Sequence, residues 1–210
     1  MTGRISIAVR VAGIVVAGGY LLGLTEGPLM MVVGGFALMT FGRGLVVERS
    51  HEALAGAALA VMAAALGVVA LRWGTFDLSE IRGVQGVLGP TLAVGPEQLA
   101  TAAGAAAAGG MAALIVWLGE APDPAVDHRW LWLFEAACGA LALVTVFWGP
   151  AWRGFDLVDI AVWAAALAFT AAFGVAGSFL VRRVHRGLAW SACAAGALAS
   201  VTAAALVAIS

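Results

Sequence analysis

Two short stretches of the sequence each place a pair of carboxylates at the same spacing. The segment WGTFDLSEI begins at Trp73, and the segment WRGFDLVDI begins at Trp152. Each contains Phe-Asp-Leu, then one further residue, then an acid and then Ile, in the same register. A repeated carboxylate pair in an otherwise apolar chain could bind a cation or a proton, or it could begin a helix at two places.

The residues around these carboxylates fill the positions that begin a helix. With Asp77 as the N-cap, Glu80 takes the third helical position, and both acids lie near the free N–H groups of the first turn. Phe76 and Ile81 then flank the cap at the two positions that pack together as a hydrophobic staple. The second copy has Phe155, Asp156, Asp159 and Ile160 in the same roles. We therefore interpret both motifs as helix starts, with a cation or proton site as the alternative.

The composition predicts that these helices lie in a membrane. The chain is 63% hydrophobic and 11% charged, whereas soluble domains have about 25% charged residues. Apolar runs of about 20 residues, enough to cross a hydrocarbon core, recur along the chain. We predict an all-α integral membrane protein with a single polytopic domain over 1–210. The predicted spans are about 5–24, 28–47, 52–72, 95–119, 129–149, 157–181 and 187–208.

The long connection after the third span contains a different pattern. Over 78–88, apolar residues alternate with polar ones so that one stripe of each kind runs along about three helical turns. The pattern ends at Gly89-Pro90, a strong helix breaker. We predict an amphipathic helix over about 78–88 that lies on the outer membrane surface.

The basic residues predict the orientation of the spans. All 11 are arginines, and the absence of lysine excludes a Schiff base, so the chain is not a retinal protein. Seven spans put Arg4, Arg10, Arg43, Arg49, Arg129, Arg182, Arg183 and Arg186 on one side, and Arg72, Arg82 and Arg153 on the other. Because cytoplasmic loops are rich in arginine, we expect the N-terminus inside and the C-terminus outside. The Ala-, Gly- and Arg-rich composition suggests the inner membrane of a prokaryote.

A second similarity extends the repeated motif. The segment EALAGAALAV at 52–61 resembles EAACGALALV at 135–144, upstream of the two carboxylate motifs. Both copies are expected to run from the inside to the outside. The chain therefore has a possible parallel internal repeat, which occurs in transporters but also in any duplicated hairpin.

Two ionisable residues are predicted to lie inside the membrane. Arg10 lies six residues after Arg4, and Glu135 lies six residues after Arg129. Both enter from the inner side, so the two groups have similar depths and could form an intramembrane ion pair. The alternative is that each side chain extends separately to the interface.

The three histidines begin three spans on the inner side. His51, His128 and His185 have carboxylates nearby, so they are weak candidates for a metal site, and two of them could hold a haem. No pair has the spacing of a known ligand motif, and histidine next to arginine at a helix end usually contacts lipid headgroups. We therefore predict no metal and no cofactor.

The fourth span is rich in small residues. The stretch TAAGAAAAGGMAAL begins at Thr101 and allows close helix packing. We expect this helix near the centre of the bundle or against a partner subunit, with the alternative that its small residues line a narrow path.

These features predict function only by class. The net charge of -1 argues against nucleic acid, and the short loops leave little room for soluble-enzyme chemistry. We expect a non-enzymatic subunit or scaffold that contacts the lipid bilayer and other membrane protein subunits. The alternative is a small-solute or ion transporter or channel, and a third is a membrane electron carrier or enzyme with an inner-face histidine site.

Overall fold

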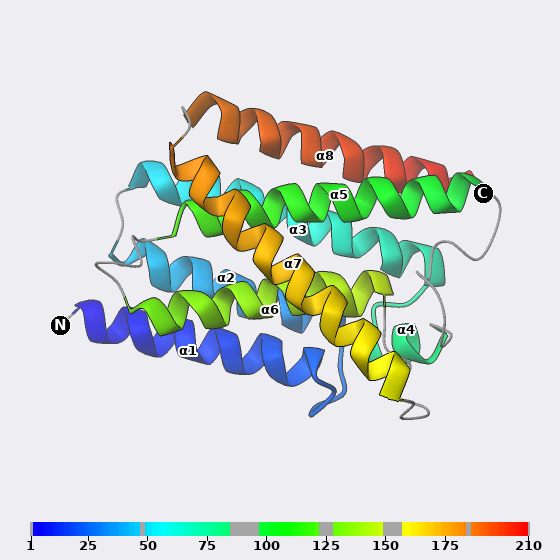
Figure 1. Ribbon diagram of the computed structural model, residues 1–210, viewed down its shortest axis with the longest axis horizontal. Coiled ribbons are helices and arrows are strands. Elements are labelled where there is room, and N and C mark those ends of the chain that lie inside the picture. The colour runs from blue at the N-terminus through cyan, green and yellow to red at the C-terminus, as the bar shows by residue number, and fades with distance from the viewer. Residues whose placement is uncertain are drawn as a thin grey trace.

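The helical prediction agrees with the computed structural model, which describes residues 2–46, 49–84, 97–121, 128–148, 157–183 and 186–209. The regular elements described there are helices, shown in Figure 1. In chain order they are α1 (Thr2–Leu21), α2 (Leu29–Gly44), α3 (Arg49–Trp73), α4 (Leu78–Val84), α5 (Glu97–Gly119), α6 (Arg129–Trp148), α7 (Leu157–Arg183) and α8 (Arg186–Ala208).

Six of these helices are long and apolar enough to cross a membrane: α1, α3, α5, α6, α7 and α8. The seventh predicted span corresponds to α2, an apolar helix of 16 residues. The predicted surface helix corresponds to α4, and residues 85–88 lie outside the described part of the chain. Over the residues that the structure describes, the protein is therefore an all-helical membrane protein with six candidate spanning helices.

The first span ends earlier than predicted. We expected helix to residue 24, but α1 ends at Leu21 because Gly23 adopts a left-handed conformation with φ of 71°. The N–H of Leu24 donates to the Gly19 carbonyl, and the N–H of Gly23 donates to that of Tyr20. These two bonds form a Schellman motif, which stops a helix whatever the hydropathy of the residues beyond it.

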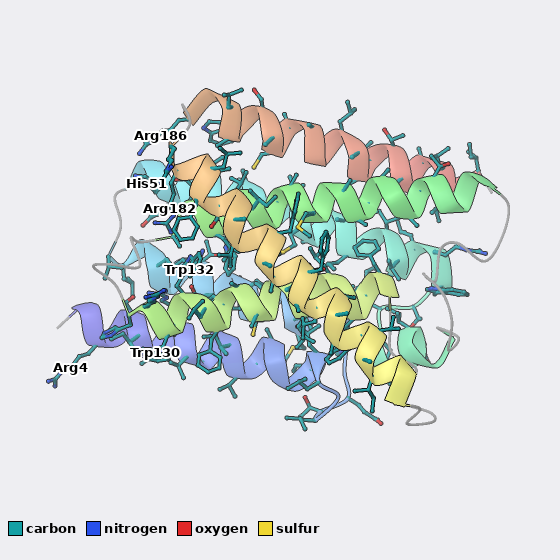
Figure 2. All side chains as sticks on the ribbon, in the orientation of Figure 1. Arg4, His51, Trp130, Trp132, Arg182 and Arg186 are labelled. Atoms are coloured by element: carbon teal, nitrogen blue, oxygen red, sulfur yellow. The ribbon has the colours of Figure 1, made fainter. Side chains whose placement is uncertain are left out.

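The helices form one bundle with α5 at its centre. Helices α1, α3, α6 and α8 begin at the same end, near the N-terminus, and α4 lies at the opposite end (Figure 1). We call the first of these the basic end, because Arg4, Arg182 and Arg186 lie there (Figure 2). Helix α5 packs against α3, α6, α7 and α8. This central place agrees with its small-residue composition.

Close contacts between glycines hold the two most extensively packed helix pairs, α1 with α2 and α5 with α8. A Cβ on Gly13 would lie 2.5 Å from the carbonyl oxygen of Gly35. A Cβ on Gly109 would lie 2.7 Å from the carbonyl oxygen of Gly196. At both crossings the backbones touch, so the missing side chains set the spacing of the helices.

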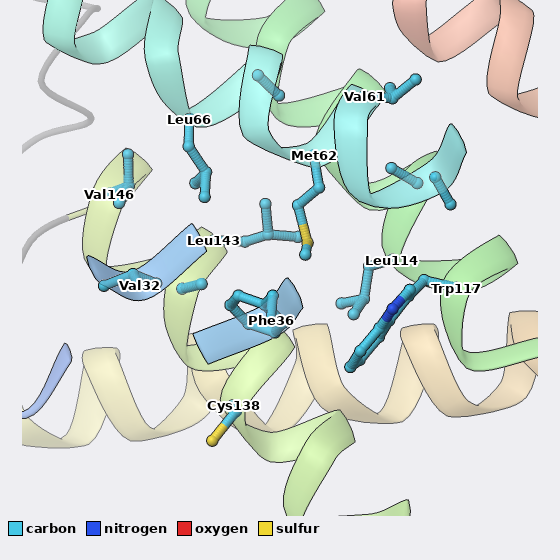
Figure 3. Packing of buried hydrophobic residues seen from close by; sticks show 14 of the residues in the cluster. Val32, Phe36, Val61, Met62, Leu66, Leu114, Trp117, Cys138, Leu143 and Val146 are labelled. Carbon is cyan, nitrogen blue, oxygen red and sulfur yellow. The ribbon is translucent and has the colours of Figure 1, made fainter. Parts of the chain in front are cut away.

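The interior between α2, α3, α5 and α6 is filled by large apolar side chains. Phe36, Met62, Leu114 and Trp117 are buried there (Figure 3). The rings of Phe36 and Trp117 meet edge to face with their centroids 5.4 Å apart. This apolar layer lies next to a cluster of charged side chains that α1, α2 and α6 supply.

Candidate functional site

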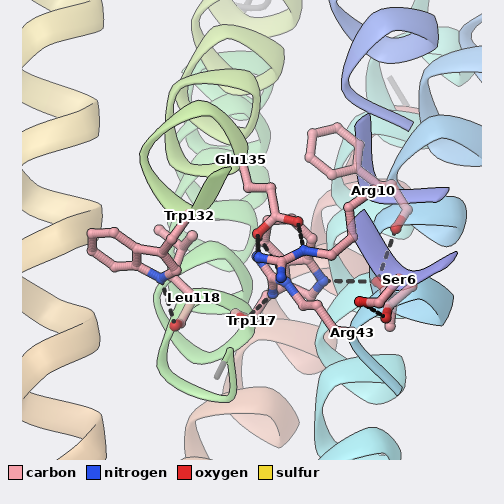
Figure 4. Close-up of polar contacts among 10 residues, drawn as sticks. Ser6, Arg10, Arg43, Trp117, Leu118, Trp132 and Glu135 are labelled. Atoms are coloured by element: carbon pink, nitrogen blue, oxygen red, sulfur yellow. Dashed lines mark hydrogen bonds and ion pairs between the residues drawn. The ribbon is translucent and has the colours of Figure 1, made fainter. Parts of the chain in front are cut away.

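Glu135 is fully buried and is bound by two arginines from two other helices. Arg10 of α1 donates from Nε to Oε1 at 2.8 Å and from Nη2 to Oε2 at 3.0 Å. Arg43 of α2 donates to Oε2 from Nε at 3.0 Å and from Nη2 at 2.6 Å. Figure 4 shows both guanidinium groups on the single carboxylate of α6. We call Arg10, Arg43 and Glu135 the buried charge cluster.

Arg43 also connects the cluster to α5 through Trp117. Its Nη1 donates to the Trp117 carbonyl at 2.8 Å, and its Cζ lies 3.7 Å from the centre of the indole ring. The indole N–H of Trp117 in turn donates to the hydroxyl of Thr40 at 2.8 Å. One guanidinium group therefore joins α2, α5 and α6 by a hydrogen bond, a cation–π contact and an ion pair.

The end of α5 supplies negative partial charge to these arginines. The last carbonyls of a helix lack partners within it and carry the negative end of the helix dipole. The Trp117 carbonyl accepts from Arg43, and the Leu118 carbonyl accepts from Arg182 Nη2 at 3.2 Å and from the Trp132 indole N–H at 3.3 Å. The cluster has two formal positive charges and one negative charge, and the α5 end partly offsets the difference.

Small residues let Arg10 reach this position. A Cβ on Gly42 would lie 2.7 Å from Cγ of Arg10, so any larger residue would meet the arginine stem. The hydroxyl of Ser6, one helical turn before Arg10, donates to the Gly42 carbonyl at 2.6 Å. The tight contact between α1 and α2 therefore carries the guanidinium group of Arg10 past α2 to α6.

The structure thus brings Arg10 and Glu135 together, and it adds Arg43, which the sequence analysis placed among the arginines of the inner side. Arg43 is 3% exposed. Its signal in the sequence was the two flanking glycines, Gly42 and Gly44, which leave space for neighbouring helices to approach its backbone.

The histidines have different environments. His51 lies with Nδ1 2.6 Å from Glu120 Oε2 and Nε2 2.6 Å from Arg186 Nη2. The ring of His128 lies 6.1 Å from that of Trp130, and His185 lies outside the described residues. In the part of the chain that is described, no group of three or more His, Cys, Asp or Glu side chains could hold a metal ion.

The first carboxylate motif caps a helix. The N–H of Ser79 donates to Asp77 Oδ1 at 2.8 Å, the hydroxyl of Ser79 donates to the same atom at 2.7 Å, and α4 begins at Leu78. These hydrogen bonds, the one from the hydroxyl first, lower the pKa of Asp77. Glu80 is exposed. Asp77 therefore acts locally on the start of α4.

The flanking residues of this motif are placed differently from each other. Ile81 is fully buried, whereas Phe76 is 50% exposed. The carbonyl of Phe76 accepts from the N–H of Leu29 at 2.6 Å, and the N–H of Leu78 donates to the Gly27 carbonyl at 3.2 Å. The start of α4 is thus attached by its backbone to Gly27 in the connection between α1 and α2 and to Leu29, the first residue of α2.

The second motif is only partly described. Phe155, Asp156 and the side chain of Asp159 lie outside the described residues. Helix α7 begins at Leu157, directly after Asp156, and Ile160 is 43% exposed on it.

No family model matches the chain, and searches of curated proteins and of solved structures gave no match either. The chemistry of the buried charge cluster is therefore the best guide to function. Its groups bond to one another and to the Trp117 carbonyl, an arrangement that suits holding helices together better than exchanging a ligand.

Proposed function

We propose that this protein is a non-enzymatic integral membrane subunit or scaffold of a larger membrane assembly. The observation that carries the proposal is the bonding of the fully buried Glu135 to Arg10 and Arg43, which come from two other helices. A carboxylate whose two oxygens are both engaged in this way fixes three helices and leaves little capacity to bind a solute. The surrounding interior is apolar, as expected for a rigid packing unit.

The outer surface supports a partner in the membrane. Helix α7 is long and apolar, but only 11% of its most apolar 18-residue stretch is buried inside the bundle. It displays Phe169 and Phe173 as a stacked pair with ring centroids 6.0 Å apart, and both are exposed. Such a face suits the lipid bilayer and the apolar helices of other subunits.

The proposed topology has seven crossings, with α2 as the short one. Its 16 residues span about 24 Å, less than the roughly 30 Å of a hydrocarbon core. Because α2 returns the chain to the basic end after α1 (Figure 1), it must cover the depth that α1 covers. The arginine-rich basic end is then the cytoplasmic side of a prokaryotic inner membrane, with the N-terminus inside and the C-terminus outside.

The parallel repeat is part of the same proposal, although its copies have diverged in role. Helices α3 and α6 run in the same direction (Figure 1). Glu52 and Glu135 occupy equivalent positions in the two sequence copies, yet Glu52 is exposed and Glu135 is fully buried. Only the second copy contributes its glutamate to the buried charge cluster.

One observation favours transport as a second candidate function. Arginine and glutamate side chains inside a spanning bundle are costly and often mark the pathway of an ion or solute. If Glu135 served such a pathway, then its replacement would abolish flux, whereas the equivalent exposed Glu52 would be dispensable.

Native mass spectrometry after gentle detergent extraction from the source membrane tests the proposal. We expect a stoichiometric complex of this chain with other polypeptides. A monomer or homo-oligomer would contradict it, especially if the purified chain in liposomes supported a solute flux that Glu135→Gln removed and Glu52→Gln preserved.

A further inference from the structure

His51 joins three elements at the basic end of the bundle. It lies in the first turn of α3, between Glu120, which follows α5, and Arg186, the first residue of α8. Nδ1 is 2.6 Å from Glu120 Oε2, and Nε2 is 2.6 Å from Arg186 Nη2. The imidazole side chain is 36% exposed and the carboxylate 8% exposed, so water reaches the ring but not most of its acidic partner.

These two contacts define the protonation state of the ring. A guanidinium group has only donors, so Arg186 can bond to Nε2 only if this nitrogen presents a lone pair. A neutral imidazole has one N–H, which must then lie on Nδ1 and donate to Glu120. The arrangement in the structure is therefore that of neutral His51 with Arg186 as donor and Glu120 as acceptor.

We propose that His51 is a proton-binding site that controls the attachment of α8 to α3. A proton from water binds to the lone pair of Nε2 and converts this nitrogen from an acceptor into a donor. The new N–H then points at the guanidinium group 2.6 Å away, where two donors of like charge repel each other. Arg186 leaves, while the imidazolium keeps its ion pair with Glu120.

The charged groups around the ring oppose one another. The carboxylate of Glu120, which follows α5, lies on the Nδ1 side of the ring, and the guanidinium group of Arg186 on α8 lies on the Nε2 side. Arg182 of α7 lies at the same end of the bundle, with Nη2 bonded to the carbonyl of Leu118, two residues before Glu120. Figure 2 shows His51, Arg182 and Arg186 at the same end. On α3 itself, Glu52 follows His51 and is exposed.

The packing of α8 confines the response to its first turn. Further along the helix, Gly196 meets α5 at the backbone contact with Gly109, and Ser200 and Ala203 are buried. Before that crossing, Leu188 and Trp190 are exposed, whereas Ala189 and Cys193 are buried. Release of Arg186 therefore frees only the residues of α8 before Ala189, because α8 is held in the bundle from Ala189 onward. This gives the proposed scaffold a small proton-dependent contact surface at the basic end.

Distances between two spin labels in the full chain test this proposal. The labels are placed on cysteines at the exposed positions Ala53 of α3 and Leu188 of α8, after replacement of Cys138 and Cys193 by alanine. In lipid nanodiscs we expect one short distance at pH 8 and a growing longer component as the pH falls to 5. His51→Gln, which keeps an acceptor but does not titrate in this range, should show the same distances at every pH.

The acidic partner provides the second comparison. Glu120→Gln keeps an acceptor for the Nδ1 proton but removes the negative partner of the imidazolium, so the longer distance component should grow less on acidification than in the original chain. Glu52→Gln should leave this growth closer to that of the original chain. Hydrogen exchange at the start of α8 gives the same comparison without cysteine substitutions. Distances and exchange that do not depend on pH, or an unchanged response in His51→Gln, would overturn the proposal.

Discussion

Gly42 of α2 lies directly against the aliphatic part of Arg10 on α1. A Cβ on Gly42 would be 2.7 Å from Cγ of Arg10 and 3.1 Å from the carbonyl oxygen of Ser6. Both distances are shorter than ordinary van der Waals contact. Because Gly42 has no Cβ, the Arg10 side chain can pass against α2 and reach the carboxylate of Glu135 in the interior.

Replacing Gly42 by alanine should destabilise the protein by about 1–3 kcal/mol, because overpacking must displace Arg10 or separate α1 from α2. Gly34→Ala is the matched control on the same helix, since a Cβ there meets no atom within 4 Å. Both substitutions gain the same helix propensity over glycine, so their difference reports the contact. Unfolding in SDS gives both free energies, and equal values would contradict the assignment.

Glu135→Gln should cost about 3–5 kcal/mol of unfolding free energy, because it leaves the guanidinium groups of Arg10 and Arg43 buried without their carboxylate. Glu52→Gln, at the equivalent position of the sequence repeat, is exposed and should have little effect. The same SDS titration measures the free energy of unfolding of each variant. If Glu135→Gln kept most of the original value, the cluster would not hold the helices together.

Replacing the whole cluster by apolar residues tests whether stability requires the charges themselves or only filled space at this position. With Arg10→Met, Arg43→Met and Glu135→Leu combined, no charge is left without a partner, and such replacements are often neutral or stabilising. We expect the triple variant to be more stable than Glu135→Gln alone. If the triple variant is less stable than Glu135→Gln, the charged contacts of the cluster stabilise the protein beyond cancelling one another's charge.

The Arg10–Glu135 contact was predictable because depth in a membrane helix follows from residue number. Each residue rises about 1.5 Å, so two side chains six residues from arginines at the same end reach similar depths. The burial of Arg43 did not follow from this rule. Hydropathy places it at a helix end, and it is buried because the end of α5 and the Trp117 ring cover it, which depends on tertiary packing.

Local backbone chemistry explains where predicted helix ends were right and where they were wrong. The first turn of α4 was predicted from Asp77, because an N-cap acts on its own neighbours. The end of α1 was placed too late, because apolar residues continue past Gly23 and hydropathy does not register a left-handed glycine. The contacts of His51 join residues from three separate elements, so no spacing in the sequence could indicate them.

Gly109→Ala should destabilise the protein more strongly than Gly104→Ala on the same helix. A Cβ on Gly109 would lie 2.7 Å from the Gly196 carbonyl oxygen and 2.8 Å from Ser200 Oγ, whereas one on Gly104 would meet no atom within 4 Å. Because the Gly196 oxygen belongs to backbone, α8 must move as a whole, at a cost of about 1–3 kcal/mol. Heating followed by size-exclusion chromatography measures the difference, and similar behaviour of both variants would argue against this crossing.

The cap of α4 should give a small contribution to stability that depends on pH. Hydrogen bonds from Ser79 lower the pKa of Asp77 from its usual 3.8. A carboxylate with a lowered pKa in the folded state stabilises the protein above its unfolded pKa, and this contribution disappears as the pH falls through the folded value. Asp77→Asn keeps a cap acceptor without the charge, so it should melt below the original chain at pH 7 and approach it below pH 3.8.

Asp77→Ala removes both the acceptor and the charge, so it should melt lower than Asp77→Asn at neutral pH, and its deficit should shrink less on acidification. Glu80→Gln provides the matched control, because Glu80 lies on the same turn and is exposed. Melting curves of the original chain and the three variants between pH 7 and pH 3 measure these differences. A deficit of Asp77→Asn that widens with acid would reverse the sign expected for a capping carboxylate and would favour a proton-binding role for this motif instead.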